Sequence, residues 1–177
     1  MKTHKLISAV LALACALTLS VSCGKNSDNA QESQPSAVLM SFISDYTEDM
    51  LDYCDIQVTF DNGKSTYQTI VVTKEILDDQ LKLKCMLGSD TLPAILTISR
   101  KVKLKEDISS LESFTYTKAH SYQFAIYDVK GDRVYLSDFF SEGGSVTGPG
   151  DKVGQLISDG GLDQEFSFHF TETGELK

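Results

Sequence analysis

Residues 80–87 read QLKLKCML, and this stretch points to the fold class. Its apolar side chains fall at every second position: Leu81, Leu83, Cys85 and Leu87. Lysines occupy two of the positions between them. A period of two is typical of a β-strand that has one face on a core and the other in water. We therefore predict a strand here, with Cys85 on its core face.

The segments around this strand repeat the pattern. Alternation is visible in residues 55–61, 67–73, 94–105, 121–140 and 166–173. The first two segments are joined through a tight turn at Asn62-Gly63, and the fourth is interrupted at residues 130–132, which predicts two hairpins. Because only hairpin-length connections are available, the strands should run antiparallel. Arg100 falls in the apolar phase of its segment, which we interpret as a sheet edge or a β-bulge.

A different period precedes these strands. The apolar residues between Ala37 and Tyr53 recur at steps of three and four: Val38, Leu39, Phe42, Ile43, Tyr46, Met50 and Tyr53. Acidic and hydroxyl side chains fill the other side, and Ser36 is placed as an N-cap. This spacing predicts an amphipathic helix over residues 37–53.

The expected fold is therefore mainly β, an all-β sandwich or a barrel-like antiparallel sheet, with one N-terminal amphipathic helix. Residues 37–177 should form a single domain. With residues 1–22 removed, 155 residues remain. A chain of that size buries roughly 70% of its unfolded surface, which is enough for a real core.

The first residues resemble an export signal. Lys2 and Lys5 precede a sixteen-residue, largely apolar run from Leu6 to Val21. That run is shorter than the roughly 20 residues needed to cross a bilayer as a helix. A basic start followed by a short apolar run is typical of a secretory signal peptide, so we expect residues 1–22 to be removed.

The residues Ser20, Val21, Ser22 and Cys23 resemble the lipobox of bacterial lipoproteins, in particular the small lipoproteins of Bacteroidota. One departure is that the usual Leu stands one step further back, as Leu19. The resemblance implies that Cys23 becomes the first residue and carries a diacylglyceryl group and an amide-linked acyl chain such as palmitate. The alternative is an ordinary secretory signal with a chance cysteine nearby.

The same resemblance implies a location in the cell envelope, lipid-anchored in the outer membrane. In Bacteroidota lipoproteins a run of acidic residues just after the cysteine can act as a surface-export signal. Here only Asp28 and Glu32 are acidic, so the periplasmic face is favoured over the cell surface. Residues 23–36 are polar, which predicts a flexible tether about 20 Å long.

Charge and cysteine content bear on nucleic-acid binding, disulfide formation and metal binding. The formal charge is −9, and it becomes −11 without Lys2 and Lys5. This acidity argues against a nucleic-acid partner. In an oxidising compartment, Cys54 and Cys85 either form a disulfide that closes a 31-residue loop or stay as separate buried thiols. No metal-ligand spacing is present, so no metal site is predicted.

Candidate sites are few. The two histidines beyond the signal, His120 and His169, are interpreted as solvated strand residues because no nucleophile motif accompanies them. The segment 141–154 is expected to be a long loop, and its glycines form a candidate binding loop: Gly143, Gly144, Gly148, Gly150 and Gly154. Asp90-Thr91-Leu92 resembles the O-glycosylation site of exported Bacteroidota proteins, which makes Thr91 a candidate acceptor.

The resulting hypothesis is a membrane-anchored, non-catalytic binding or assembly module of the cell envelope that acts through a sheet face or the Gly143–Gly154 loop. It needs no cofactor, and an envelope protein is its candidate partner. Two alternatives stay open. One is a calyx-like carrier of a small ligand, and the other is a hydrolase that uses His120 or His169.

Overall fold

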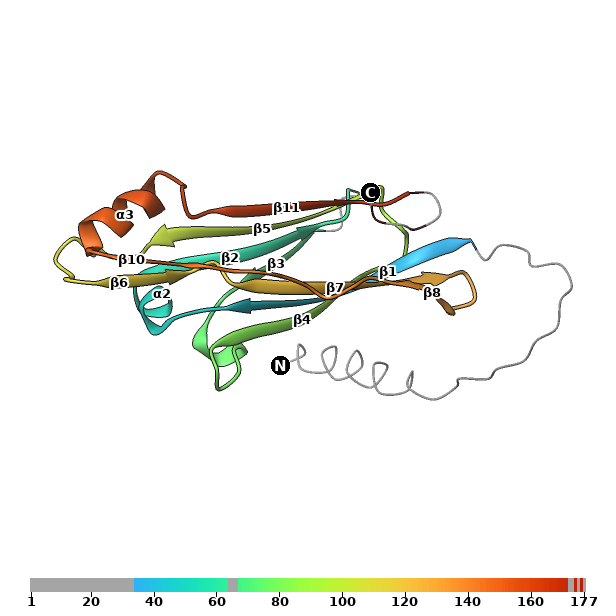
Figure 1. Cartoon of the computed structure of the whole chain (residues 1–177), viewed down its shortest axis with the longest axis horizontal. Helices are drawn as coiled ribbons and strands as arrows, with labels where there is room; N and C mark the ends of the chain where they lie inside the picture. Colours follow the sequence, from blue (N-terminus) through green and yellow to red (C-terminus); the bar gives the residue numbers. More distant parts are fainter. Residues whose placement is uncertain (1–33, 64–66, 172–173, 175, 177) are drawn as a thin grey trace, which may run out of the picture. The chain divides into compact units, whose positions relative to one another are not determined.

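The computed structural model describes residues 34–63, 67–171, 174 and 176 (Figure 1). Its strands are β1 (Pro35–Asp45), β2 (Cys54–Asp61), β3 (Tyr67–Val71), β4 (Lys82–Ser89), β5 (Ile95–Leu104), β6 (Phe114–Thr117), β7 (His120–Asp128), β8 (Arg133–Leu136), β9 (Phe140–Glu142), β10 (Ser145–Gly148) and β11 (Gln164–His169). The helices are α2 (Glu48–Tyr53), α3 (Gly150–Ser158) and the 3₁₀ turn η1 (Lys74–Ile76).

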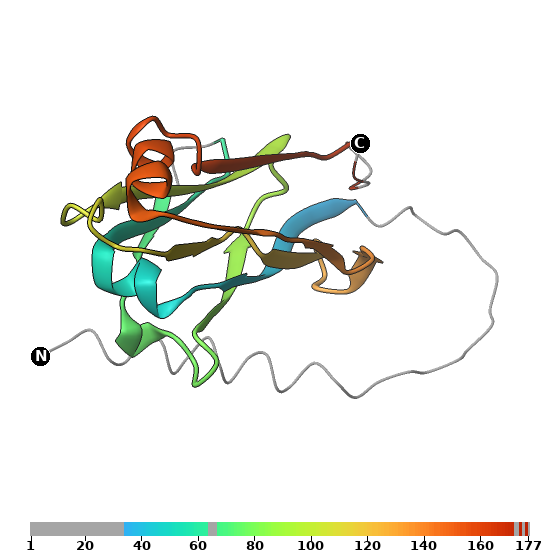
Figure 2. The same ribbon diagram turned by 60° about the vertical axis from the view of Figure 1, so that its left-hand side comes forward.

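Two antiparallel sheets form the body of the domain. Sheet A has the order β4-β1-β7-β8, with β9 also paired to β7, and sheet B has the order β11-β5-β2-β3. A two-stranded ribbon of β10 and β6 completes the described strands. Figures 1 and 2 show the sheets as two layers. The prediction of a mainly β, antiparallel fold is confirmed, and its form is a β-sandwich.

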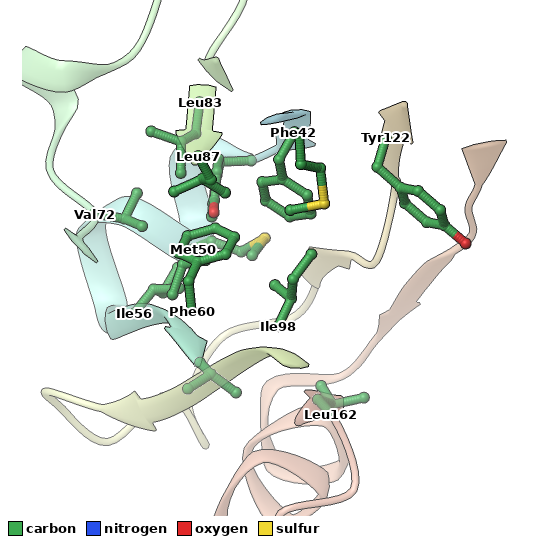
Figure 3. Packing of buried hydrophobic residues seen from close by; sticks show 14 of the residues in the cluster. Phe42, Met50, Ile56, Phe60, Val72, Leu83, Leu87, Ile98, Tyr122 and Leu162 are labelled. Atoms are coloured by element: carbon green, nitrogen blue, oxygen red, sulfur yellow. The ribbon is translucent and has the colours of Figure 1, made fainter. Parts of the chain in front are cut away.

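The core lies between the two sheets. Phe42 on β1 meets Phe60 on β2 edge to face, with ring centroids 5.7 Å apart. Phe124 on β7 meets Phe168 on β11 in the same way at 4.7 Å. Figure 3 shows Phe42, Phe60 and further core side chains pointing toward one another. Both sheets therefore bury one face of period-two side chains, as the alternation predicts.

The helix predicted over residues 37–53 is wrong for most of its length. Residues 35–45 form β1, and only Glu48–Tyr53 is helical, with Thr47 Oγ1 accepting a hydrogen bond from the Met50 amide. β1 lies between β4 and β7, and while Met40 and Phe42 are buried toward the core, Leu39 and Ile43 are half-buried on the other face. Apolar side chains on both faces hide the period of two and imitate helical spacing.

Both predicted hairpins are confirmed. β2 and β3 pair antiparallel from Asp61↔Tyr67 onward, and the expected turn residues Asn62 and Gly63 follow β2 directly. The β7–β8 turn fits the prediction too. There Gly131 has a φ of +85°, a left-handed conformation that favours glycine.

The long glycine loop predicted over residues 141–154 is also wrong. These residues form parts of β9, β10 and α3. Two of the glycines, Gly150 and Gly154, serve close packing, and a Cβ added at Gly150 would lie 1.8 Å from the Ile108 carbonyl oxygen. At Gly154 it would lie 3.1 Å from Ile108 Cγ1. The absence of side chains lets α3 approach the backbone around Ile108, which no residue with a Cβ would allow at position 150.

Candidate functional site

A fully buried arginine lies between the sheets, although its place in the sequence had suggested a sheet edge or a bulge. Arg100 is 2% exposed, and its strand β5 lies inside sheet B between β11 and β2 with continuous register on both sides. The edge or bulge interpretation is therefore wrong. The guanidinium group points into the core, where a charge needs partners.

The partners of this guanidinium group are neutral. Arg100 Nη1 donates to Ser44 Oγ at 2.8 Å, and Nη2 donates to the Thr117 carbonyl at 2.6 Å. The Tyr46 and Tyr116 rings lie 5.6 Å and 5.4 Å from the guanidinium carbon, within cation–π range. Among the described residues, no carboxylate pairs with Arg100 within 4.0 Å.

The two tyrosines do not supply a counter-charge. Burial raises the pKa of Tyr46 and of Tyr116, while the charge of Arg100 opposes the shift. Both phenols therefore stay neutral at physiological pH. Arg100 links β5 of sheet B to the last residues of β1 and β6. Its hydrogen bond to Ser44 therefore holds the end of β1 from the core side.

That end of β1 lies under a hollow on the outer face of sheet A, which we name the β1 groove. Its volume is about 350 Å³. It is lined by Ile43, Asp45, Gln80, Lys82, Lys84, Ala119, His120, Ser121 and Ser141. Amines, a carboxylate, an amide and hydroxyls thus lie beside the apolar side chains of Ile43 and Ala119, a mixture suited to orienting a polar ligand.

The charged side chains of the groove are held in place. Lys82 Nζ lies 3.2 Å from Asp45 Oδ1, and Lys84 Nζ lies 2.6 Å from Asp78 Oδ2. The bond to Lys84, together with backbone amide donors, lowers the pKa of Asp78, which stays ionised. The Asp45 amide also donates to the Ala119 carbonyl at 3.0 Å, which fixes the rim of the groove.

A second hollow lies on the outer face of sheet B and has a volume of about 330 Å³. Lys101, Lys103 and Asp55 are among its lining residues. Unlike the lysines of the β1 groove, these two form no ion pair within the described part of the chain. The β1 groove is therefore the better organised of the two.

The structure separates the two candidate histidines. His120 is buried, so its interpretation as a solvated residue is wrong. Its ring lies 4.2 Å from the Phe166 ring, and Nδ1 is 3.0 Å from the Lys118 carbonyl oxygen. The nearest carboxylate, on Glu142, is 3.9 Å from Nε2. His169 is exposed at the end of β11, paired with Ile95 in sheet B.

The other predicted sites are dispersed. Gly148 ends β10, and Gly150 and Gly154 are buried in α3, so the glycines do not form one loop. Thr91 is exposed in the turn between β4 and β5, as a glycan acceptor requires. Cys23 and most of the predicted tether lie outside the described residues, and the strand β1 begins at Pro35, before the expected end of the tether at Ser36.

Cys54 and Cys85 are free thiols, so the disulfide alternative is not realised. They lie on strands of different sheets, β2 and β4. Burial raises the pKa of Cys54 to about 11 and that of Cys85 to about 12. Because the thiolate is the reactive form, both should be poor nucleophiles at neutral pH.

This predicts a specific labelling pattern for the exported protein. Under denaturing, non-reducing conditions a maleimide should label both Cys54 and Cys85. In the folded protein labelling should be slow at pH 8 and should rise about tenfold for each pH unit up to pH 10, since the thiolate fraction does so well below the pKa. Mass spectrometry of the tryptic peptides measures both. Absence of labelling after denaturation would show that the two cysteines are paired.

One cavity between the sheets is small. A cavity lined by Val38, Phe60, Leu87 and Leu96, among others, has a volume of about 30 Å³. This is room for about one water molecule, whereas small-molecule pockets take several hundred Å³. The calyx-like carrier hypothesis finds no support in this cavity.

The described residues contain no group of three or more His, Cys, Asp or Glu side chains arranged to hold a metal ion. Within the same residues no helix is long and apolar enough to cross a membrane. No protein-family model, curated protein or solved structure matches the chain.

Sequence reasoning missed the burial of Arg100 among its polar and aromatic partners, and it missed the β1 groove. The signal for the first was available, because a charged residue in the apolar phase of a strand can be inside the core as well as at an edge. Nothing in the sequence signals the groove, because its lining comes from separate segments around residues 43–45, 80–84, 119–121 and 141.

Proposed function

We propose that the chain is a lipid-anchored, non-catalytic binding module of the cell envelope, and that it binds a partner protein in the β1 groove. The anchor is inferred from the lipobox-like residues Ser20 to Cys23 and the polar segment after them. The envelope location, on the periplasmic face of the outer membrane, follows from the same residues.

The observation that carries the binding proposal is the preorganisation of the groove. Arg100 holds Ser44 through its side chain from the core side, directly before Asp45 on the rim. Asp45 and Asp78 hold the two lysines from the outer side. A site whose polar groups are fixed in advance loses less conformational entropy when a partner binds, which favours affinity.

The charges of the groove suggest the chemistry of the partner. Each of Lys82 and Lys84 is already paired with a carboxylate, so the groove is close to neutral. Such a surface suits a polar polypeptide segment that carries amide and hydroxyl groups, with Ile43 available for one apolar side chain. A dense anion would be less well matched, since Asp45 and Asp78 would repel it.

The anchor is tested by the variant Cys23→Ala. Without the thiol no lipid can be attached, and a polar tether has no affinity of its own for a bilayer. The protein should therefore move from the membrane fraction to the soluble envelope fraction. Immunoblots of the two fractions measure this, with Cys85→Ala as a control that should stay in the membrane fraction. Retention of Cys23→Ala in the membrane would refute the lipid anchor.

The groove is tested by photo-crosslinking in intact cells. A photoreactive amino acid in place of Ser141, on the groove rim, should give a discrete adduct with one partner. The matched control is Ser167, which is also exposed but lies on β11 of the opposite sheet. The adduct should be at least fivefold stronger at position 141, and the added substitution Lys82→Ala should weaken it. Equal adducts at both positions would contradict binding in the groove.

A further inference from the structure

The described chain enters the domain beside the turn of a hairpin. Pro35 is the first residue of β1 and pairs with Asp128, the last residue of β7. Residues 129–132 then turn the chain into β8. Figure 1 shows the start of β1 and the β7–β8 turn at the same end of the sandwich. Whatever precedes Pro35 therefore leaves the domain next to this turn.

The turn exposes apolar and cationic side chains together. Val129 is 73% exposed, the highest value among the exposed large hydrophobic residues, and Val134 is 37% exposed. Lys130 and Arg133 are exposed between them and form no ion pair within the described part of the chain. We name these four residues the hairpin tip.

The tip is held rigidly in this exposed state. Asp128 is 4% exposed, and its Oδ1 accepts hydrogen bonds from the amides of Lys130 and Asp132 at 2.8 and 2.9 Å. The Gly131 amide also donates a hydrogen bond to the Asp128 carbonyl oxygen at 3.0 Å. With the carboxylate of Asp128 directed at backbone amides, Asp132 is the acid that remains exposed in the turn. These bonds fix the backbone of the turn on both sides of Val129.

We propose that the hairpin tip rests on the lipid surface in which the acyl chains of Cys23 are inserted. This rests on the lipid anchor of the proposed function. The twelve residues from Gly24 to Pro35 span at most about 40 Å, so the tip stays close to the bilayer. Apolar side chains flanked by Lys and Arg are the composition of an interfacial contact, and the cations favour anionic headgroups.

This contact would fix the orientation of the binding groove. Pro35 and Asp45 are the two ends of β1, ten residues apart, which is roughly 33 Å along an extended strand. The tip lies beside Pro35, and the β1 groove contains Asp45. With the tip on the membrane, the groove lies at the far end of β1, where a partner in the adjoining compartment can reach it.

Depth-dependent fluorescence quenching tests this orientation in the full lipidated protein. The variant Val129→Cys carries a polarity-sensitive fluorophore, and Ser113→Cys, exposed beside β6 at the opposite end of the domain, is the matched control. Cys54 is buried and Cys85 is half-buried, and the raised pKa of both thiols slows their labelling at neutral pH. The proteins are placed in phosphatidylethanolamine vesicles with 30% phosphatidylglycerol and a headgroup-labelled nitroxide lipid.

The label at position 129 should be quenched at least threefold more than the label at position 113. Adding Lys130→Glu and Arg133→Glu should lower this difference by half or more. Equal quenching at the two positions in vesicle-bound protein would overturn the proposal while leaving the anchor intact. Failure of the anchor itself would show separately, because the protein would then not sediment with the vesicles.

Discussion

Arg100→Ala should lower the free energy of unfolding by about 3–4 kcal/mol. The side chain is among the largest that are fully buried in the domain, so truncation leaves a cavity between the sheets. The substitution also leaves Ser44 Oγ and the Thr117 carbonyl without their donors in the core. Urea unfolding followed by circular dichroism measures the change.

Two further variants separate packing from polar contacts. Arg100→Met keeps most of the volume and removes the charge, and since a buried charge is itself costly, the loss should be smaller, about 1–2 kcal/mol. Arg133→Ala, on an exposed arginine of β8, should change stability by less than about 0.5 kcal/mol. If Arg100→Ala lowered the free energy of unfolding no more than Arg133→Ala, the contacts of Arg100 would have no role in joining the sheets.

The same variants also test whether Arg100 affects partner binding in the β1 groove. Because Arg100 holds the end of β1 that presents Asp45, Arg100→Met should weaken the photo-crosslink at position 141 even where the domain remains folded. The guanidinium group does not line the groove, so this effect would be one of positioning.

Gly150→Ala should destabilise the domain by about 3 kcal/mol or more, because the added methyl group overlaps backbone. The new Cβ would lie 1.8 Å from the Ile108 carbonyl oxygen and 2.9 Å from the carbonyl carbon. Neither atom can move aside by a change of rotamer, so α3 must shift away from the Ile108 segment. Urea unfolding gives the loss, and amide hydrogen exchange should show faster exchange in residues 150–158 than in β1.

Gly148→Ala is the matched control for this prediction. Gly148 lies two residues earlier on β10, has no positive φ, and an added Cβ would meet Val153 Cγ2 at an ordinary 3.7 Å. Its expected effect is within about 1 kcal/mol. A loss at Gly150→Ala no greater than at Gly148→Ala would show that α3 does not depend on this close approach.

The strands with one solvent-exposed face and one face on the core were predictable from the sequence. β4 alternates Leu83 and Leu87 with exposed Lys84 and Met86, and the pairing of β7 with β8 follows from the turn around Gly131. In these segments the local pattern and the final environment agree, because water on one side and core on the other impose a period of two on the residues themselves.

The strand β1, the buried Arg100 and the packing of α3 could not be predicted in this way. β1 has sheet neighbours on both sides and partial cover on its outer face, so its residues carry no alternation. For Arg100, an edge and a core position both fit the sequence until Ser44, Tyr46 and Thr117 are brought around it. The glycines of α3 predicted a loop from the sequence alone. The Ile108 segment, whose close approach requires them, is distant in the chain.

The sequence by itself therefore determined the mainly β fold, the hairpins and the expectation of a lipid anchor at Cys23, since each of these depends on neighbouring residues. Only the tertiary structure decided which charge is buried, which glycines are contacts and where a groove opens. These features arise where segments distant in the chain meet, and a polar group or a missing Cβ acquires its role from what lies opposite it in space.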